Sequence, residues 1–156
     1  MNDRDIIFLL EDNSLLLEQL KEALEKNEYI KTQANVFPCL SIELANTAYD
    51  EFKDRIACLA CDSNMSSVGL PDNLRSESKG GLFSGWLWMR EKIIADESLA
   101  DRSLVYSAYF DELQKVMHQN PLFSKVPCVR KKTISTWDNE EIIKVIISIL
   151  KVQKGR

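Results

Sequence analysis

Residues 56–65 read IACLACDSNM, an apolar run that ends directly on an aspartate, Asp62. A short segment of small and apolar residues is typical of a strand in the middle of a parallel sheet, where helices cover both faces. Residues 6–10, IIFLL, have the same character and are followed by Glu11 and Asp12. The chain is therefore predicted to contain two buried strands whose carboxyl ends carry acidic side chains.

The rest of the chain alternates between helical and strand-like patterns. Helical spacing of apolar residues is found in residues 14–26, 39–53, 82–93, 111–118 and 138–150, and weaker or shorter strand candidates occupy residues 30–36, 103–107 and 126–130. This alternation predicts an α/β fold, with a parallel sheet and helices on both of its faces. The apolar stripes expected on the helices are Leu16, Leu20, Ala23 and Leu24; Leu40, Leu44, Ala48 and Phe52; Leu82, Trp86, Met89 and Ile93; and Ile142, Ile146, Ile149 and Leu150.

Two local signals concern the last strand and the last helix. Pro127 stands near the start of the strand candidate 126–130, which suits a strand at the edge of a sheet. Asp138 and Glu141 have the spacing of a capping box, with the aspartate at the cap. We therefore expect the final helix to begin at this pair.

Residues 66–79 interrupt the alternation. They contain four serines, Gly69, Pro71 and charges of both signs, which is typical of a loop, and two glycines follow them. We interpret residues 66–80 as an insertion within a single domain that spans residues 1–156. The insertion is expected to hang over the strand ends, as a lid or as a surface for a partner.

Composition argues against several classes of function. The 156 residues carry a formal net charge of −4, so there is no electrostatic reason to expect nucleic acid or an anionic membrane surface as a partner. No apolar run approaches the roughly 20 residues of a membrane-spanning helix, and the first residues lack the basic region of a signal peptide. We expect a cytoplasmic protein.

The cysteines are expected to be structural. Cys58 and Cys61 form a C-x-x-C pair, but residues three apart on a strand point to opposite faces. No second pair of cysteines or histidines stands at the spacing of zinc ligands. We interpret the four cysteines, Cys39, Cys58, Cys61 and Cys128, as small apolar residues in a reducing compartment.

Polar side chains follow four of the predicted strands. Because ligands of an open parallel sheet bind beyond the carboxyl ends of its strands, these side chains are expected to meet at one edge. Three carboxylates in one crevice repel each other unless a cation compensates, and hard oxygen ligands suit Mg²⁺ or Mn²⁺. The residues in question are Glu11, Asp12, Asp62, Ser107, Lys131 and Lys132.

Such a set has the parts needed for phosphoryl transfer. A carboxylate beside the metal can attack phosphorus and hold the group as an acyl phosphate. A lysine and a hydroxyl can neutralise the phosphoryl oxygens during transfer. Taken singly, the two aspartates also fit helix caps or loop acids, the lysines fit a solvated pair, and Ser107 fits a simple strand-end hydroxyl.

The same motifs resemble those of the receiver domains of two-component response regulators. FLLEDNS at residues 8–14 is similar to the acidic pair after the first strand, and CDSNM at residues 61–65 is similar to the acceptor motif. Ser107 with Ala108 matches the hydroxyl and small residue after the fourth strand, and Lys132 with Thr133 matches the lysine step after the fifth. The resemblance implies a CheY-like, flavodoxin-like fold, with a doubly wound five-stranded parallel sheet of order 2-1-3-4-5.

The resemblance also implies a role for each residue. Asp62 would be the phosphoacceptor, Asp12 and Asp62 would bind Mg²⁺ directly, and Glu11 would act through a metal-bound water. Asn64 would supply its backbone carbonyl to the metal. Ser107 would bind a phosphoryl oxygen, and a lysine would pair with Asp62 or its phosphate. For that lysine Lys132 is favoured, with Lys131 as the alternative.

A receiver of this kind takes its phosphoryl group from a histidine kinase or a phosphotransfer protein. Since the sequence ends soon after the last helix, we expect output by binding another protein, with a homodimer as a further possibility. Apart from its own phosphorylation and dephosphorylation, such a chain is not expected to be an enzyme.

The sequence departs from the family pattern at four points. The altered lysine step, the missing aromatic residue and the long insertion favour a second hypothesis, a receiver-like interaction module that is never phosphorylated. Thr133 stands where proline usually follows the lysine, and serine replaces the commoner threonine at Ser107. Val129, or Cys128 in the other register, replaces the aromatic switch residue. The insertion 66–80 lengthens the link after the acceptor. A third hypothesis, a Mg²⁺-dependent phosphohydrolase, has the weakest support, because a D-x-D motif is missing.

Overall fold

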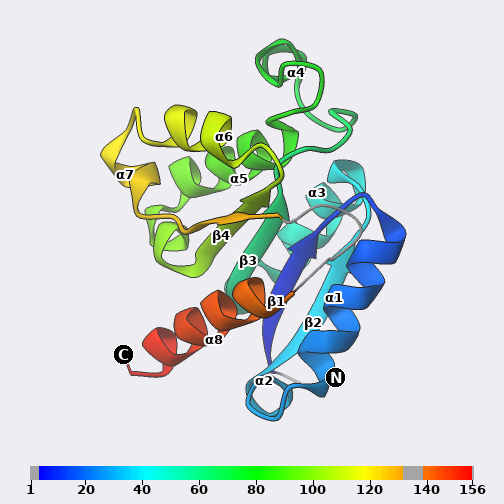
Figure 1. The fold of residues 1–156 in the computed structure, drawn as a ribbon, viewed down its shortest axis with the longest axis vertical. Helices are drawn as coiled ribbons and strands as arrows, with labels where there is room; N and C mark the ends of the chain where they lie inside the picture. Colours follow the sequence, from blue (N-terminus) through cyan, green and yellow to red (C-terminus); the bar gives the residue numbers. More distant parts are fainter. Residues whose placement is uncertain (1–3, 132–138, 156) are drawn as a thin grey trace.

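A parallel sheet forms the centre of the computed structural model, which describes residues 4–131 and 139–155. Within these residues the strand order is β2-β1-β3-β4-β5 (Figure 1). All neighbouring strands run parallel, so the predicted fold class and strand order are confirmed. The strands are β1 (Asp5–Leu10), β2 (Ala34–Cys39), β3 (Ile56–Asp62), β4 (Ser103–Ser107) and β5 (Cys128–Arg130).

Helices connect the strands and cover both faces of the sheet. The α-helices are α1 (Ser14–Lys26), α2 (Ile30–Gln33), α3 (Ile42–Phe52), α4 (Asp72–Glu77), α5 (Ser84–Ala95), α6 (Phe110–Met117), α7 (Pro121–Ser124) and α8 (Glu140–Lys154). Two 3₁₀ turns precede β3 and β4, at Lys53–Arg55 (η1) and Glu97–Arg102 (η2). None of the described helices has the length and apolar character needed for a membrane span.

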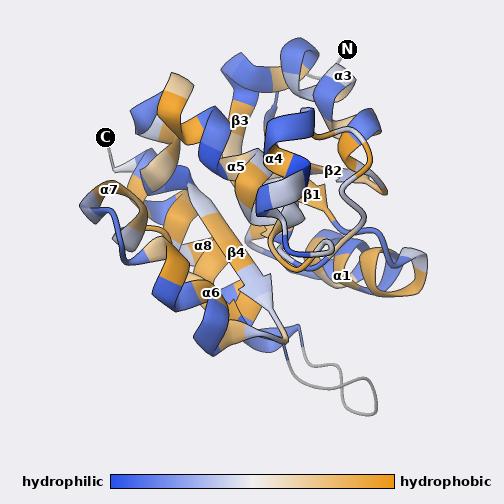
Figure 2. Cartoon of the chain, turned by 90° about the horizontal axis from the view of Figure 1, so that it is seen from above, coloured by the Kyte–Doolittle hydropathy of each residue, from blue (hydrophilic) through white to orange (hydrophobic). Residues whose placement is uncertain are grey.

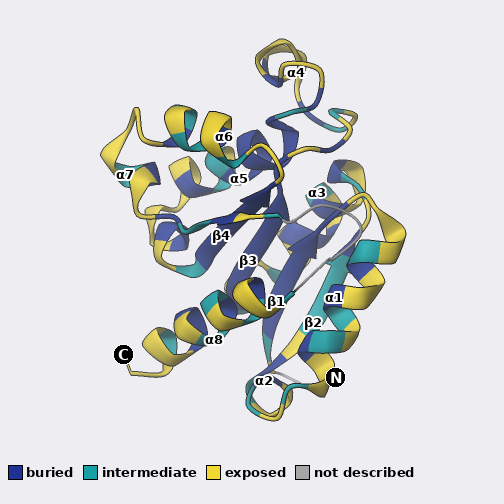
Figure 3. Ribbon diagram, in the orientation of Figure 1, coloured by how far each residue is buried: buried dark blue, intermediate teal, exposed yellow. Residues whose placement is uncertain are grey.

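Strand β1 divides the interior into two cores. Because successive side chains of a strand point to opposite faces, Ile7 and Leu9 pack with α1 and α8, whereas Phe8 and Leu10 pack with α3 and α5. All four side chains are fully buried, and Figure 3 shows the strands buried between the helices. The two-sided burial explains why residues 6–10 of β1 and 56–61 of β3 are all apolar.

The prediction that Cys58 and Cys61 are structural residues on opposite faces of a strand is confirmed in β3. Cys58 and Cys61 are both fully buried, and they belong to the two different cores on either side of β3. The four cysteines are free. In Cys58, burial raises the pKa of the thiol to about 12, so it behaves as an inert, small apolar side chain.

The start of β2 was predicted too early. The segment 30–36 was expected to be a strand, but its first half forms α2 and the strand begins at Ala34. The Asn27 side chain accepts hydrogen bonds from the backbone N–H groups of Tyr29 and Ile30, which turns the chain into this short helix. Ile30 is fully buried beneath it. The Asn27 cap and the buried Ile30 side chain together outweigh the strand-like composition of this segment.

The buried face of α3 also differs from the expected stripe. Ser41 caps the helix by accepting from the N–H of Leu44, so the helix begins at residue 42 instead of 39. Leu40 and Leu44 are 44% and 58% exposed, while Ala48 remains buried as predicted. The side chains that actually face the core are Ile42, Ala45, Ala48 and Tyr49.

Helix α5 buries Trp86, Met89 and Ile93 of its predicted stripe, but the first half of the helix is not amphipathic. Every residue from Ser84 to Met89 is buried, because the helix is covered on its outer side as well. The ring of Trp86 packs edge-on against Phe123 of α7, with 5.2 Å between the centroids. Leu74 of α4 joins the same core. The presumed loop 66–80 therefore contains a helix and contributes to the interior.

The last strand and the last helix follow the predicted pattern more closely. β5 lies at the edge of the sheet, as Pro127 suggested, and the predicted stripe of α8 is buried. The residue before α8 is Asn139, whose side chain makes no capping hydrogen bond. The helix begins at Glu140, and the expected cap, Asp138, lies outside the described residues.

Gly85 of α5 gives a test of how closely this helix approaches β3. A Cβ atom at this position would lie 1.8 Å from the backbone oxygen of Asp62. We expect Gly85→Ala to destabilise the protein by about 1–3 kcal/mol or more through overpacking, although alanine normally favours a helix. Urea unfolding measures the change.

Gly155→Ala is the matched control, because its Cβ would meet its nearest neighbour at an ordinary 3.6 Å. We expect little change in this variant. Equal stability of the Gly85 and Gly155 variants would contradict the close approach of α5 to β3.

Candidate functional site

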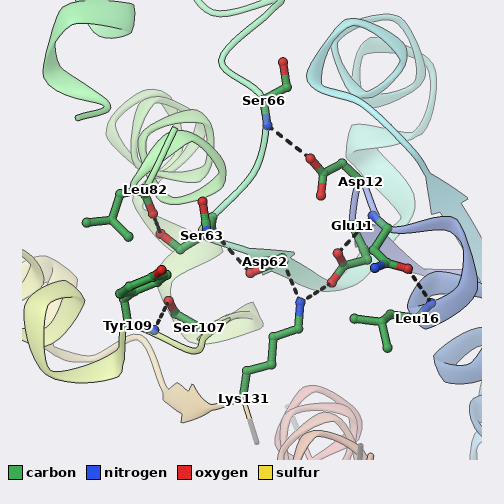
Figure 4. Close-up of polar contacts among 12 residues, drawn as sticks. Glu11, Asp12, Leu16, Asp62, Ser63, Ser66, Leu82, Ser107, Tyr109 and Lys131 are labelled. Atoms are coloured by element: carbon green, nitrogen blue, oxygen red, sulfur yellow. Dashed lines mark hydrogen bonds and ion pairs between the residues drawn. The ribbon is translucent and has the colours of Figure 1, made fainter. Parts of the chain in front are cut away.

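The candidate site is built from the carboxyl ends of the strands, as the sheet topology predicts. Glu11 directly follows β1, Asp62 is the last residue of β3, and Ser107 is the last residue of β4. Lys131 follows β5, and its backbone N–H donates to the carbonyl of Ser107 at 2.9 Å. Figure 4 shows Glu11, Asp62 and Lys131 meeting from separate strands, with the Ser107 hydroxyl bonded instead to the backbone of Tyr109.

Three carboxylates meet at this edge. Glu11, Asp12 and Asp62 each place one carboxylate oxygen within 4.8 Å of the other two. Glu11 and Asp62 are 1% and 3% exposed, whereas Asp12 is exposed. The predicted convergence of acids from two strands is therefore present, with one of the three open to solvent.

The lysine at the centre of the cluster is Lys131. Its Nζ lies 2.7 Å from Oδ2 of Asp62 and 3.1 Å from Oε2 of Glu11, and its side chain is 13% exposed. The lysine that contacts the carboxylates is therefore Lys131, which was the alternative in the sequence analysis. Lys132, which was favoured there, lies outside the described residues.

Burial and like charge shape the protonation of the cluster. Burial, and then the neighbouring Glu11 charge, raise the pKa of Asp62 to about 8, against the opposing attraction of Lys131. Burial tends to lower the pKa of Lys131, but the charges of Asp62 and Glu11 outweigh it, so its pKa rises. Near neutral pH the ammonium of Lys131 is therefore charged, and burial favours the protonated form of Asp62.

Backbone N–H groups orient the carboxylates. The N–H of Asn13 donates to Oε1 of Glu11 at 3.1 Å, and the N–H of Asn64 donates to Oδ1 of Asp62 at 3.3 Å. Asn64, the predicted donor of a backbone carbonyl to the metal, is exposed beside the cluster. The carboxylates of Glu11 and Asp62 are therefore each held by the backbone N–H two positions further along the chain.

Asp12 is held from further away in the sequence. Its Oδ2 accepts from the N–H of Ser66 at 3.1 Å, across 54 residues of chain. Ser107, the predicted phosphoryl-binding hydroxyl, is fully buried. Its Oγ accepts from the N–H of Tyr109 at 2.9 Å, which turns the chain after β4.

Sequence reasoning missed Tyr106 and Ser66. Tyr106 is fully buried, and the Nζ of Lys131 lies 5.6 Å from its ring centroid. Burial, followed by the charge of Glu11, raises the pKa of its phenol well above the ordinary value. A tyrosine within the otherwise small and aliphatic strand SLVYS was a usable signal. Ser66 offered none, because it acts through its backbone.

The donor set fits a hard divalent cation. Three carboxylates supply oxygen ligands only, and such ligands are preferred by Mg²⁺ and Mn²⁺. The exposure of Asp12 provides access from solvent. The ammonium of Lys131 already compensates the two buried carboxylates, so an ion would add to a partly neutralised site.

Comparison with solved structures places the fold among receiver domains. A crystal structure of a response regulator receiver domain protein from Clostridium thermocellum is 16% identical, with a TM-score of 0.65 over 96% of this chain and 97% of that chain. A sensor protein from Polaromonas sp. JS666 is 21% identical, with a TM-score of 0.61 over 95% and 97%. No protein-family model and no curated protein matches the chain. The predicted resemblance is thereby confirmed at the level of the fold.

The raised pKa of Asp62 predicts how stability depends on pH in chelator-containing buffer. Since the folded protein binds this proton more tightly than the unfolded chain, the contribution of Asp62 to stability falls as pH rises from about 4 to about 8. Asp62→Asn removes the buried charge and should change the melting temperature only slightly at pH 5, where most of the Asp62 contribution is still present. At pH 9 it should raise it by roughly 4–8 °C, which corresponds to about 2 kcal/mol.

Thermal melts of both proteins at the two pH values measure this difference. Asp72→Asn on α4 changes an exposed aspartate and serves as the control, with equal effects at both pH values. A loss of stability in Asp62→Asn at pH 9 would show that attraction to Lys131 outweighs burial.

Proposed function

We propose that this chain is a receiver that accepts a phosphoryl group on Asp62 in two-component signal transduction. The observation that carries the proposal is the cluster itself: Glu11, Asp12 and Asp62 lie within 4.8 Å of one another, with the Lys131 ammonium 2.7 Å from Asp62. The similarity of the fold to a response regulator receiver domain, over 96% of this chain, supports the same function.

In the proposed reaction an oxygen of Asp62 attacks the phosphorus of a phosphohistidine. The new O–P bond forms as the N–P bond breaks, and the imidazole leaves with the bonding electron pair. The product is an acyl phosphate on Asp62. Lys131 Nζ neutralises charge on the phosphoryl oxygens. The Ser107 hydroxyl, whose oxygen accepts from the N–H of Tyr109, donates its own proton to one of these oxygens.

Glu11 and Asp12, with Asp62 and the backbone carbonyl of Asn64, would hold the divalent cation. The ion supplies charge neutralisation at the phosphoryl group, which the Lys131 ammonium alone does not complete. The donor of the phosphoryl group is proposed to be a histidine kinase or a phosphotransfer protein. Output is proposed to be a change of surface recognised by another protein.

A second candidate is a receiver-like interaction module that stays unphosphorylated. The observation that favours it is the burial of Asp62, which is only 3% exposed, beneath a lysine that bridges two carboxylates. Assignment of Lys131 to the lysine step also places Cys128 at the position of the aromatic switch. In this alternative the cluster is purely a structural ion pair.

Uptake of phosphate analogues separates the two candidates. We expect Mg²⁺-dependent binding of beryllofluoride, followed by ¹⁹F NMR, and Mg²⁺-dependent labelling by acetyl phosphate, followed by intact mass. Asp62→Asn should abolish both signals, because it removes the nucleophile. Asp72→Asn should retain both. Absence of uptake by the wild-type protein would favour the unphosphorylated module.

The identity of the working lysine gives an independent prediction. We expect Lys131→Ala to lower the rate of labelling by acetyl phosphate by about 100-fold, the usual cost of losing a group that stabilises transferred charge. Lys132→Ala should stay within about twofold of wild type. Time courses by mass spectrometry measure both, and the reverse ranking would assign the role to Lys132.

A further inference from the structure

The segment that links β3 to α5, residues 66–83, is closed at its base by the backbone. The N–H of Met65 donates to the carbonyl of Gly81 at 3.1 Å, and the hydroxyl of Ser63 donates to the carbonyl of Leu82 at 2.9 Å. Gly81 has a φ of +100°, and a Cβ there would lie 2.7 Å from the Met65 oxygen. The base therefore requires glycine at this position.

The 66–83 segment is also docked on α3. Asn46 donates from Nδ2 to the carbonyl of Gly69 at 3.1 Å and accepts from the indole N–H of Trp88 at 2.8 Å. A Cβ on Gly69 would lie 2.7 Å from the backbone nitrogen of Glu43. Leu70 is buried. The segment thus has a defined seat on α3, although α4, which lies within the segment, is largely exposed and hydrophilic apart from the buried Leu74 (Figures 2 and 3).

Its first residue reaches the carboxylate cluster. The N–H of Ser66 donates to Oδ2 of Asp12 at 3.1 Å, and Figure 4 shows this contact on the outer side of the cluster. Asp12 is the exposed member of the three carboxylates. An exposed aspartate samples several rotamers, so a fixed donor determines where its oxygens point. Oδ1 remains available to a cation, because a carboxylate offers about four acceptor sites.

We propose that the 66–83 segment is part of the cation site: the backbone N–H of Ser66 positions Asp12, so cation binding and docking of the segment on α3 stabilise each other. The inference rests on the cation site of the proposed function. It assigns Ser66 as a positioning residue and Asn46 as the anchor of its segment. Because such coupling is reciprocal, the ion must also hold the segment in its seat.

Binding of Mn²⁺, followed by the electron paramagnetic resonance of the free ion, tests the positioning role. Ser66→Pro removes the donor, and Ser66→Ala keeps the N–H while removing the hydroxyl. We expect the dissociation constant of Ser66→Pro to rise about three- to tenfold, as for a lost hydrogen bond to a charged acceptor. Ser66→Ala should stay within about twofold of wild type.

Asn46→Ala provides a second variant that does not touch the cluster, in case proline disturbs the fold. It should weaken Mn²⁺ binding about two- to threefold, while Thr47→Ala, on the exposed side of α3, should not. Amide hydrogen exchange supplies the reciprocal readout. Mn²⁺ should slow exchange in peptides covering residues 66–70 of the wild-type protein, and Asp12→Ala should speed it without any metal.

The outcomes separate the inference from the function on which it rests. Wild-type binding of Mn²⁺, with equal affinity in Ser66→Pro and Ser66→Ala and unchanged exchange at 66–70, would overturn the coupling and leave the cation site intact. Absence of Mn²⁺ binding by the wild-type protein would overturn both the cation site and the coupling. Faster exchange in metal-free Asp12→Ala, together with weaker binding in Ser66→Pro, would establish the coupling.

Discussion

Lys131 holds two nearly buried carboxylates, those of Glu11 and Asp62, at one edge of the sheet. A buried carboxylate without a compensating charge is costly, and two close together are more so. Their cation comes from the far end of the described strands, after β5, so the cluster is compensated only when β1, β3 and β5 are all in place. The site therefore ties the two halves of the sheet together, and removal of the ammonium would leave the two buried carboxyl groups without their compensating cation.

The two cores explain how these polar groups reach their positions. Alternate residues of β1 and β3 pack on opposite faces of the sheet, which fixes the register of both strands. A slip of one residue would exchange the faces and carry the strand-end acids away from each other. The close contact of Gly85 with the Asp62 carbonyl adds a further constraint, because α5 can sit there only with glycine. Packing thus determines where the charges lie.

Sequence reasoning recovered the features that follow from regular patterns. Apolar runs identified the strands, and the acids after β1 and β3 were expected to meet, as Glu11 and Asp62 do. It was wrong where a single local contact decides the structure. The Asn27 cap makes a helix from part of a strand-like segment, and no periodicity signals it. The covering of α5 depends on Phe123, which is distant in sequence, and on Leu74, which belongs to the preceding segment that was interpreted as a loop. Contacts through the backbone, such as that of Ser66, leave no trace in residue type.

The same reasoning explains why the insertion after β3 was underestimated. Its serines, glycines and proline fit a loop, but glycines at +100° in φ, such as Gly69 and Gly81, build close backbone approaches as well as flexible turns. The close approach at Gly81 closes the base of the 66–83 segment, and the one at Gly69 allows the segment to dock on α3. Because the Asp12 carboxylate is oriented by this segment rather than by its own strand, the geometry of the exposed side of the cluster is set by the insertion. A shorter link after β3 would have to orient Asp12 by another contact.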